Sequence, residues 1–393
     1  MYNFVTHLRK ETHKQMENKE LGIGKDISLI VLSAGNSTRF NYPVKKQWIR
    51  IGNKPLWLFV ADRLNSFYNF KKTIITANEK DVRLYEKLSD CQIVKGASER
   101  QYSLINALNS VETEYVMVTD VARTCIPKTV IDRLLNNPAE CTVPFLKPVD
   151  TVVYENSTID REKVKLIQTP QLSKTEVLKK ALQTDKLFTD ERAAIEFIGG
   201  KIRYVEGSEE SKKITYFSDL NLPCLTPPSK KIFVGNGYDT HRFEQNKKMV
   251  LGGVEIDVDY GLKAHSDGDV VIHSLIDAFL GAAGFGDIGE FFPDTDEKYK
   301  NISSVNLLKE VLNTLTYTGF ETVNADITII AQKPRLKEYK TKIQRNLSNL
   351  LNAQVNVKAT TNEKMGFIGR CEGIAVISTA TLKYKDWHED YNS

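Results

Sequence analysis

Cysteine is scarce in this chain, and its pattern argues against several common classes of protein. The five cysteines form no C-x-x-C pair and are widely scattered, at positions 91, 125, 141, 224 and 371. An odd and scattered set of this kind indicates neither a disulfide framework nor a cysteine-rich zinc site. We therefore expect reduced thiols, which are typical of a cytoplasmic protein.

Long hydrophobic runs and a large net charge are also missing. No run approaches the ~20 apolar residues that a helix needs to cross a bilayer. The first residues, MYNFVTHLRKETHKQMENKE, are charged throughout and contain no apolar segment of the kind found in signal peptides. The formal net charge of +4 is too small to favour nucleic acid, although it is compatible with small anionic substrates. The sequence thus predicts neither a membrane nor a nucleic-acid partner.

Length and composition predict a globular protein of two domains. The chain has 393 residues, of which 41% are hydrophobic and 26% are charged, as is usual for soluble folded proteins. We expect a polar extension over residues 1–26, a first domain over 27–220 and a second domain over 232–384. The segment 221–231, NLPCLTPPSKK, contains three prolines and should form a stiff, extended linker. Residues 385–393 should form a frayed polar tail.

Short apolar runs alternate with helical patterns in the first domain. ISLIVL, KKTIITAN, DCQIVKG, EYVMVTD and ECTVPF are typical of strands, and KPLWLFVADRLNSF, SERQYSLINALNSV and PKTVIDRLLNN are typical of helices. This alternation predicts an α/β fold with a doubly wound, Rossmann-like sheet. Ligands of such sheets bind outside the carboxyl ends of the strands.

A polar loop, SAGNSTRFNYPVKKQW, follows the first of these strands. Residues 35–38 should be flexible, and their backbone N–H groups could surround a phosphate. Arg39 and Lys46 could stabilise the negative charge of a transition state. The loop is neither a Walker loop nor a G-x-G-x-x-G motif. The alternative is an ordinary strand-to-helix loop with solvated charges.

Only six histidines occur in the chain, and three of them lie between residues 241 and 273. Asp239 and His241 are two residues apart at the end of an apolar run, so a strand would point both side chains to one face. His273 lies in VVIHSLIDAFLG, whose apolar spacing predicts a helix. One carboxylate and two imidazoles, with a fourth position open, form a donor set typical of catalytic zinc. The alternative is that His273 is a core residue, as a histidine on an apolar helix often is.

Five motifs of the second half occur in the order and spacing of one enzyme family. They are GYDTHRF, AHSDGDVVIH, GDIGEFFPDTD, ADITIIAQKP and VKATTNEKMGFIGRCEGIA. This half resembles 2-C-methyl-D-erythritol 2,4-cyclodiphosphate synthase over residues 232–384. The resemblance implies an α/β domain with a mixed sheet that assembles into a homotrimer or a multiple of it. It also implies that the 2-phosphate of a cytidine-diphospho-methylerythritol closes the ring and expels CMP.

The same resemblance assigns individual residues. Asp239, His241 and His273 would hold Zn²⁺ or another divalent cation, and Glu363 would hold a second ion, Mg²⁺ or Mn²⁺. His265 and Thr361 would stabilise the transition state. Phe367 and Arg370 would line a pocket on the three-fold axis or serve trimer packing. Substrate contacts are implied for Asp239, His241, Ser266, Asp287, Ile288, Gly289, Phe292, Asp294, Asp296, Ala331, Arg335, Thr360, Glu363, Phe367 and Arg370.

The first half resembles a second family, 2-C-methyl-D-erythritol 4-phosphate cytidylyltransferase. The matching motifs are LSAGNSTRF, VKKQW, GASERQYSL, VTDVART, VDTV, IDR, TPQL, FTDE and VEGSEESKKIT. The resemblance implies that a cytidylyl group passes from CTP to the sugar phosphate with the help of Mg²⁺ or Mn²⁺, and that diphosphate leaves. Arg39 and Lys46 would be catalytic. Ser103 and Asp120 would contact the nucleotide and its metal, and Arg161 and Lys213 the sugar phosphate.

Three positions of the first half depart from the pattern of this family. Lys45 stands where proline is usual, Ser33 replaces an alanine, and Thr124 replaces a proline. These departures bear on the rigidity of the loop, and so on rate, more than on the type of reaction.

Together the two resemblances predict a bifunctional enzyme of the methylerythritol phosphate route to isoprenoid precursors. Its substrates would be CTP and methylerythritol phosphates. The step between the two reactions needs a kinase, and because neither half has kinase motifs, a separate kinase is expected. One alternative is a nucleotide-binding scaffold with a structural zinc ion. Another is a sugar nucleotidyltransferase for a different substrate, which the presence of the second half disfavours.

Overall fold

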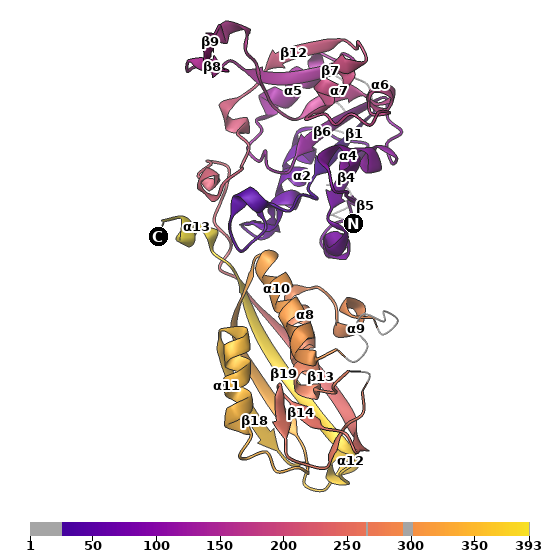
Figure 1. The fold of residues 1–393 in the computed structure, drawn as a ribbon, viewed down its shortest axis with the longest axis vertical. Coiled ribbons are helices and arrows are strands. Elements are labelled where there is room, and N and C mark those ends of the chain that lie inside the picture. Colours follow the sequence, from indigo (N-terminus) through magenta and orange to yellow (C-terminus); the bar gives the residue numbers. More distant parts are fainter. Residues whose placement is uncertain (1–25, 265, 294–301, 393) are drawn as a thin grey trace, which may run out of the picture. The chain divides into compact units, whose positions relative to one another are not determined.

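The structure, a computed structural model, describes residues 26–264, 266–293 and 302–392. They divide into two compact units (Figure 1). Unit 1 extends to Pro227 and also includes the C-terminal residues from His388, whereas unit 2 comprises Pro228–Trp387. The predicted extension over 1–26 lies almost entirely outside the described residues. Within the described ranges, no helix combines the length and the apolar character needed to span a membrane.

Unit 1 is built on an eight-stranded sheet with the order β10-β7-β11-β6-β1-β4-β5, in which β12 also pairs with β7. The neighbours β6, β1, β4 and β5 are parallel. All six residues of β1 (Ile27–Leu32) are buried, which explains why its sequence is a continuous apolar run. The predicted doubly wound α/β sheet is therefore confirmed. One strand, β11 (Gln171–Lys174), lies antiparallel between β6 and β7 and was not anticipated.

The elements of unit 1 include every strand and helix that the sequence predicted there. The strands are β1 Ile27–Leu32, β2 Arg50–Ile51, β3 Lys54–Pro55, β4 Lys72–Ala77, β5 Gln92–Lys95, β6 Tyr115–Asp120, β7 Cys141–Leu146, β8 Val152–Tyr154, β9 Ser157–Ile159, β10 Leu166–Ile167, β11 Gln171–Lys174 and β12 Ile202–Glu206. The α-helices are α2 Leu56–Phe67, α3 Val82–Glu86, α4 Arg100–Leu108, α5 Lys128–Asn136, α6 Thr175–Ala181 and α7 Glu191–Phe197, and two short 3-10 turns near the predicted loop are η1 Thr38–Phe40 and η2 Lys46–Trp48.

A disulfide joins Cys125 to Cys224 in unit 1 across a sequence separation of 99 residues. The expectation of reduced thiols was therefore wrong for this pair. Spacing along the chain could not reveal it, because only folding brings the segment after β6 beside the predicted linker 221–231. The other three cysteines, Cys91, Cys141 and Cys371, are free thiols.

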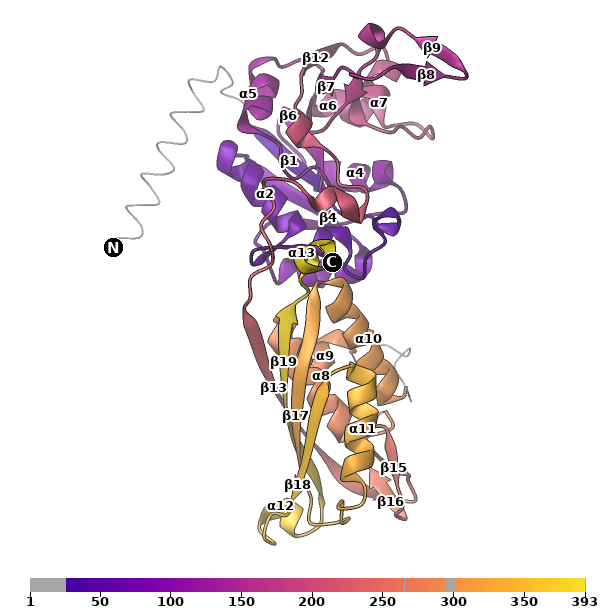
Figure 2. The same ribbon diagram turned by 90° about the vertical axis from the view of Figure 1, so that its left-hand side faces the viewer.

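Unit 2 contains a five-stranded sheet with the order β16-β13-β19-β17-β18. Helices α8, α10 and α11 lie together on one side of this sheet (Figure 2). The strands are β13 Ile232–Gln245, β14 Met249–Leu251, β15 Val254–Ile256, β16 Tyr260–Leu262, β17 Phe320–Ile330, β18 Gln354–Thr360 and β19 Gly373–Tyr384. The helices are α8 Val270–Ala283, α9 Ile288–Phe291, α10 Ser304–Tyr317, α11 Lys340–Leu351 and α12 Gly366–Gly369. Most pairs are antiparallel, but β17 and β18 are parallel, so the predicted mixed sheet is confirmed.

The C-terminal segment is ordered rather than frayed. Residues Trp387–Asn392 form the helix α13, and Trp387 is buried. Within unit 1, the Tyr42 hydroxyl donates a hydrogen bond to Asp390 over 2.5 Å. The expectation of a frayed tail was wrong for these residues. It was based on the polar residues of the segment and did not consider its aromatic side chains.

Candidate active sites

A cavity of about 620 Å³ opens in unit 1 where β1, β4 and β6 end. Leu32, Thr76 and Asp120, at or next to the carboxyl ends of these strands, all line it, as expected for a ligand site of an open α/β sheet. The lining also includes the loop at residues 35–38. Of the residues predicted for this half, the lining contains Arg39, Lys46, Ser103, Asp120 and Lys213. Arg161 is absent from it; this exposed side chain donates to the carbonyl oxygen of Val149.

The loop at the cavity is held in place by a glutamine. Gln47 accepts a hydrogen bond from the Ser37 hydroxyl over 2.7 Å, and its amide donates to the carbonyl oxygen of Gly35 over 2.9 Å. Gln47 itself is buried. The expectation of a flexible loop was therefore wrong: its backbone N–H groups are held in a fixed arrangement, which suits phosphate binding better than a mobile loop does.

Asp120 is the centre of a charged network in the cavity. Its carboxylate accepts from Arg100 Nε over 2.9 Å and from Lys213 Nζ over 2.7 Å, and Arg100 also reaches the buried Glu191 over 2.8 Å. Burial alone would raise the pKa of Asp120, but the two cations outweigh burial and hold the pKa well below its ordinary value. Asp120 is therefore ionised at neutral pH and can contact a metal ion or a cation.

Lys46 lies in the same cavity, and among the described residues its ammonium group forms no ion pair with a carboxylate. Its Nζ donates to the carbonyl oxygen of Ile214 over 2.9 Å. Burial, followed by the positive charge of Lys213, lowers the pKa of Lys46 to about 8. The ammonium group is thus available to a negatively charged ligand.

The three positions that depart from the family pattern all have specific contacts. Lys45 pairs with the buried Asp81 over 3.1 Å. The Ser33 hydroxyl lies 2.9 Å from the Tyr85 hydroxyl. Thr124 is buried next to the disulfide between Cys125 and Cys224. Ser33 also lines the cavity, whereas the lining does not include Lys45 or Thr124.

In unit 2, a strand and a helix bring the predicted triad together. Asp239 and His241 lie on the same face of β13, and His273 is in the first turn of α8. Gly235 and Gly237 lie on this face of β13, where a Cβ atom would meet the backbone of α8 at 2.0 Å and 1.9 Å. The glycines therefore allow α8 to approach β13 closely enough for His273 to reach the strand.

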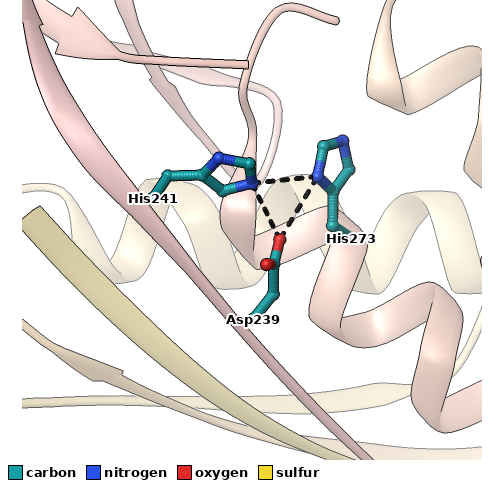
Figure 3. Close-up of side chains that lie close together, drawn as sticks. All are labelled: Asp239, His241 and His273. Atoms are coloured by element: carbon teal, nitrogen blue, oxygen red, sulfur yellow. Dashed lines mark hydrogen bonds and ion pairs between the residues drawn. The ribbon is translucent and has the colours of Figure 1, made fainter. Parts of the chain in front are cut away.

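The three side chains converge on one point (Figure 3). Asp239 Oδ2 lies 2.9 Å from His241 Nε2 and 3.3 Å from His273 Nδ1, and the two imidazole nitrogens are 3.3 Å apart. One ligand atom of each residue lies within 4.8 Å of the other two. Since zinc–ligand bonds are about 2.0–2.2 Å long, one ion between these atoms can contact all three. The donor set and the geometry fit a divalent cation, and the alternative of His273 as an apolar core residue is not supported.

The electrostatics of the triad also suit a cation. Burial raises the pKa of Asp239, but the hydrogen bonds to His241 and His273 outweigh burial and place the pKa well below its usual range. For His241, burial lowers the pKa, while Asp239 outweighs burial and gives a net increase. The carboxylate is therefore ionised, and His241 Nδ1 lies 2.8 Å from the carbonyl oxygen of Lys263, which can only accept. This contact leaves Nε2 as the nitrogen that faces the triad.

Comparison with known proteins supports both halves of the chain. Residues 27–224 match the family 2-C-methyl-D-erythritol 4-phosphate cytidylyltransferase, and residues 232–383 match the YgbB family. A bifunctional enzyme IspD/IspF of Aliarcobacter butzleri is 56% identical over 369 residues, which are 92% of this chain and 99% of that protein. The chain belongs to the bifunctional IspD/IspF family.

Further relatives agree with this assignment. The bifunctional enzyme IspD/IspF of Nitratiruptor sp. is 51% identical and covers 93% of this chain and 99% of its own length. The structure of the bifunctional IspDF from Campylobacter jejuni is 50% identical, has a TM-score of 0.82, and covers 92% of this chain and 100% of that one. As an IspD/IspF protein, the chain is a cytidylyltransferase in its first half and a cyclodiphosphate synthase in its second half, in the methylerythritol phosphate pathway. This membership decides against the scaffold and against a nucleotidyltransferase for another sugar.

The remaining residues predicted for the synthase half fall into two groups. Near the triad, the Ser266 hydroxyl lies 3.2 Å from His273 Nε2, and Asp287 caps the short helix α9. Ile288 and Gly289 follow in α9, and Phe292 is buried directly after it. His265, Asp294 and Asp296 lie outside the described residues.

In the second group, Thr360 ends the edge strand β18 and Thr361 and Glu363 follow it, whereas Phe367 and Arg370 lie in and next to α12, directly before β19. Thr361 donates to Glu363 over 2.7 Å just beyond β18, and Thr360 accepts at its carbonyl from the N–H of Ala331 over 3.0 Å. Arg335 and Phe367 are exposed, and Arg370 pairs with Glu372 over 2.7 Å. One row of paired residues, Asp239, Val376, Ile329 and Ala359, crosses the four strands from β13 to β18. At about 4.8 Å per strand, the backbones of Asp239 and Ala359 lie roughly 14 Å apart within one chain.

Two residues of the Asp120 network were not singled out from the sequence. Arg100 lines the cavity and is partly exposed, and it joins Asp120 to the fully buried Glu191. Both stand in motifs, GASERQYSL and FTDE, that pointed to the family. Their charge was the available signal, but folding alone brings the first residue of α4 beside the first residue of α7, which the spacing of motifs does not reveal.

Proposed function

We propose that Arg39 and Lys46 are the catalytic cations of the cytidylyl transfer from CTP to 2-C-methyl-D-erythritol 4-phosphate. The observation that carries this proposal is the juxtaposition of both cations with a fixed loop of N–H groups around one cavity. Both reactants are anions, so the barrier contains a large electrostatic repulsion. Fixed positive charge beside the α-phosphate lowers that barrier most when its attraction to the phosphate is stronger in the transition state than in the ground state.

Asp120 would bind a metal ion in this cavity, and Lys213 would contact the sugar phosphate. Asp120 is an ionised oxygen donor of the kind that Mg²⁺ or Mn²⁺ prefers, and such an ion, when bound, would neutralise the triphosphate. Lys213 pairs with Asp120 and is 40% exposed, so it can leave the carboxylate and meet the sugar phosphate. Ser103 lines the cavity and would contact the nucleotide. Arg161 stays a predicted contact of the sugar phosphate.

We infer that Asp239, His241 and His273 hold a divalent cation, Zn²⁺ in the first instance, for the cyclisation. When bound, this ion would act as a Lewis acid on the diphosphate. The chain's own residues would orient the substrate around it. Ser266 and residues 287–289 would contact the methylerythritol part, so that its 2-phosphate attacks the β-phosphate and CMP leaves. His265 would assist at the transition state.

The second group of synthase residues suggests a shared active site. Thr361 and Glu363 would hold the α-phosphate and a second ion, Mg²⁺ or Mn²⁺, while Ala331, Arg335 and Thr360 would hold the cytidine. The row from Asp239 to Ala359 spans three strand spacings of about 4.8 Å, roughly 14 Å, which is more than one diphosphate spans. We propose that the Thr361–Glu363 group of one chain completes the triad of a second copy.

The bare face of the unit 2 sheet supports a homotrimer or a multiple of it. Tyr238 and Ile377 are cross-strand neighbours on this face and are 55% and 40% exposed. Val234, on the same face of β13, is 65% exposed. Exposed apolar side chains in one row favour burial against another subunit. In such an assembly, Phe367 and Arg370 would lie near the axis.

We also propose how the two catalytic domains are joined, where they act and which further enzyme they need. Residues 27–220 and 232–384 would work as separate catalytic domains joined by 221–231, in the cytoplasm, where CTP is made. A separate kinase would phosphorylate the 2-hydroxyl between the two reactions.

Two single substitutions test the assignment of both sites. Lys46→Ala should lower diphosphate release from CTP by about 10²–10³-fold and leave cyclisation unchanged. His241→Ala should abolish cyclisation and metal binding but leave CTP turnover unchanged. The purified parent protein should contain about one zinc ion per chain. Loss of both activities in either variant, with the fold intact, would contradict two independent sites.

A further inference from the structure

The side of His273 that faces away from the triad contacts a partly buried pair of polar residues, Ser304 and Asp267. His273 Nε2 lies 2.9 Å from the hydroxyl oxygen of Ser304, and that hydroxyl lies 2.5 Å from Asp267 Oδ1. Ser304 is the first residue of α10 and is fully buried. The other oxygen of Asp267 accepts from the backbone N–H of Ser304 over 3.0 Å. The carboxylate therefore holds Ser304 by both its backbone and its side chain.

The proton inventory of these groups determines the direction of each hydrogen bond. An ionised carboxylate can only accept, so the single hydroxyl proton of Ser304 points to Asp267. The hydroxyl oxygen then has only lone pairs left for His273. The hydrogen bond between Ser304 and His273 consequently requires a proton on Nε2. In a neutral imidazole, Nδ1 is then the bare nitrogen, and Nδ1 is the atom that faces Asp239 and His241.

We infer that Ser304 and Asp267 are positioning residues of the metal site: they fix His273 in the Nε2–H tautomer and so present Nδ1 to the ion. The inference rests on the proposed function, in which the triad holds a divalent cation. A hydrogen-bonded partner on the second nitrogen fixes the orientation of a ligating histidine and raises its basicity. The charge of Asp267 acts on the imidazole through the Ser304 hydroxyl.

The two histidines of the triad are held in complementary ways. His241 donates from Nδ1 to the carbonyl oxygen of Lys263 and presents Nε2, whereas His273 donates from Nε2 and presents Nδ1. Ser266 also lies near His273 Nε2, but at the longer distance of 3.2 Å, and its hydroxyl oxygen already accepts from the N–H of Gly268. Ser304 is the closer of the two hydroxyls and the one in contact with a carboxylate.

Zinc affinity of the full chain, measured by competition with a chelator at constant pH, tests the inference. Ser304→Ala removes the acceptor for Nε2–H and should weaken zinc binding by about 10–100-fold. The matched control is Ser303→Ala, one residue earlier, whose side chain makes no capping hydrogen bond to α10. This control should keep the affinity of the parent within about twofold, well inside the change expected for a lost partner.

Asp267→Asn tests the direction of the proton chain without a change of shape. The Ser304 N–H can only donate, so the amide oxygen of Asn must stay opposite it and the NH₂ group must face the hydroxyl. The hydroxyl then has to accept from the amide and turns its own proton to His273 Nε2. This arrangement favours the wrong tautomer, so zinc affinity should fall at least as far as in Ser304→Ala.

A measurement on the parent protein completes the test. Nitrogen-15 spectra of histidine-labelled, zinc-loaded protein should show a protonated Nε2 on His273, whereas a protonated Nδ1 would overturn the inference. Circular dichroism of each variant separates weaker binding from failure to fold. If the parent binds no zinc, the proposed metal site fails. If the parent binds zinc and both variants bind it equally well, the metal site stands and the role of Ser304 and Asp267 is refuted.

Discussion

Lys46 is largely buried in a cavity that contains another cation, and this determines the pH range in which it is charged. Its ammonium group donates to Ile214 O over 2.9 Å, in a cavity that also contains Lys213. Burial and the neighbouring positive charge lower its pKa to about 8, so Lys46 is a cation below that pH and is neutral above it. A catalytic cation with this pKa loses its charge only slightly above neutral pH.

The cytidylyl transfer should therefore lose activity as the pH rises through about 8. We expect kcat/KM for diphosphate release to fall by about tenfold per pH unit above that value, because the rate follows the fraction of protonated Lys46. Lys46→Arg keeps its charge over this range, since arginine stays protonated up to about pH 12. The variant should lose this alkaline decline. An unchanged decline in Lys46→Arg would assign it to another group.

At the scale of elements, the position of His273 depends on how closely α8 packs on β13. A methyl group at Gly237 would meet the carbonyl oxygen of Ser274 at 1.9 Å, so Gly237→Ala must push the helix away. We expect the free energy of unfolding to fall by about 1–3 kcal/mol, as in other overpacked interiors. Zinc affinity should fall as well, because His273 moves with the helix. Chemical denaturation and chelator competition measure the two effects.

The matched control is a glycine of α8 that lies outside this contact. Gly281 is an exposed residue of α8, and a Cβ atom there would have no neighbour within 4 Å. Gly281→Ala should raise the free energy of unfolding by about 0.5–1 kcal/mol, because alanine favours the helix interior. Zinc affinity should stay the same. Equal behaviour of the two variants would mean that close packing at Gly237 does not position His273.

The disulfide between Cys125 and Cys224 connects the end of β6 to the segment that leaves unit 1. By constraining the unfolded chain, a cross-link over 99 residues stabilises the folded state, typically by about 2–4 kcal/mol. We expect a thiol reductant to lower the unfolding temperature of the parent and to have no such effect on Cys224→Ser. Cys91→Ser, which replaces a free thiol, should respond to the reductant like the parent. An unfolding temperature that ignores the reductant in all three proteins would argue against the cross-link.

For the whole molecule, the sequence predicted what depends on pattern and missed what depends on packing. The buried run Ile27–Leu32 and the alternation around Asp239 and His241 predicted the right elements. A strand that is buried on both faces is apolar throughout, and a strand that is buried on one face alternates between apolar and polar residues. The contact of Gln47 with Gly35 and the disulfide left no such trace, since their partners meet only after folding. Ser304 stands in none of the family motifs and reaches His273 only through the packing of α10.

The order β13-β19-β17-β18 has a consequence for assembly that no local pattern contains. It places Asp239 and His241 three strands away from β18, after which Thr361 and Glu363 follow, so each chain would hold two partial sites of the proposed shared active site. A charge on the bare face of the sheet should therefore separate the subunits and remove cyclisation, although the triad itself is intact. Tyr238→Lys is the sharpest choice, because this side chain is 55% exposed and its cross-strand neighbour is Ile377.

Sedimentation velocity of Tyr238→Lys should show a smaller assembly than that of the parent, and cyclisation should fall with it. CTP turnover should persist, because the cytidylyltransferase cavity is lined by residues of unit 1 alone. Leu187→Lys provides a control, since Leu187 is 52% exposed in unit 1 and should leave both assembly and cyclisation unchanged. A dissociated Tyr238→Lys protein that still cyclises its substrate would show that one chain is sufficient, and the shared site would have to be abandoned.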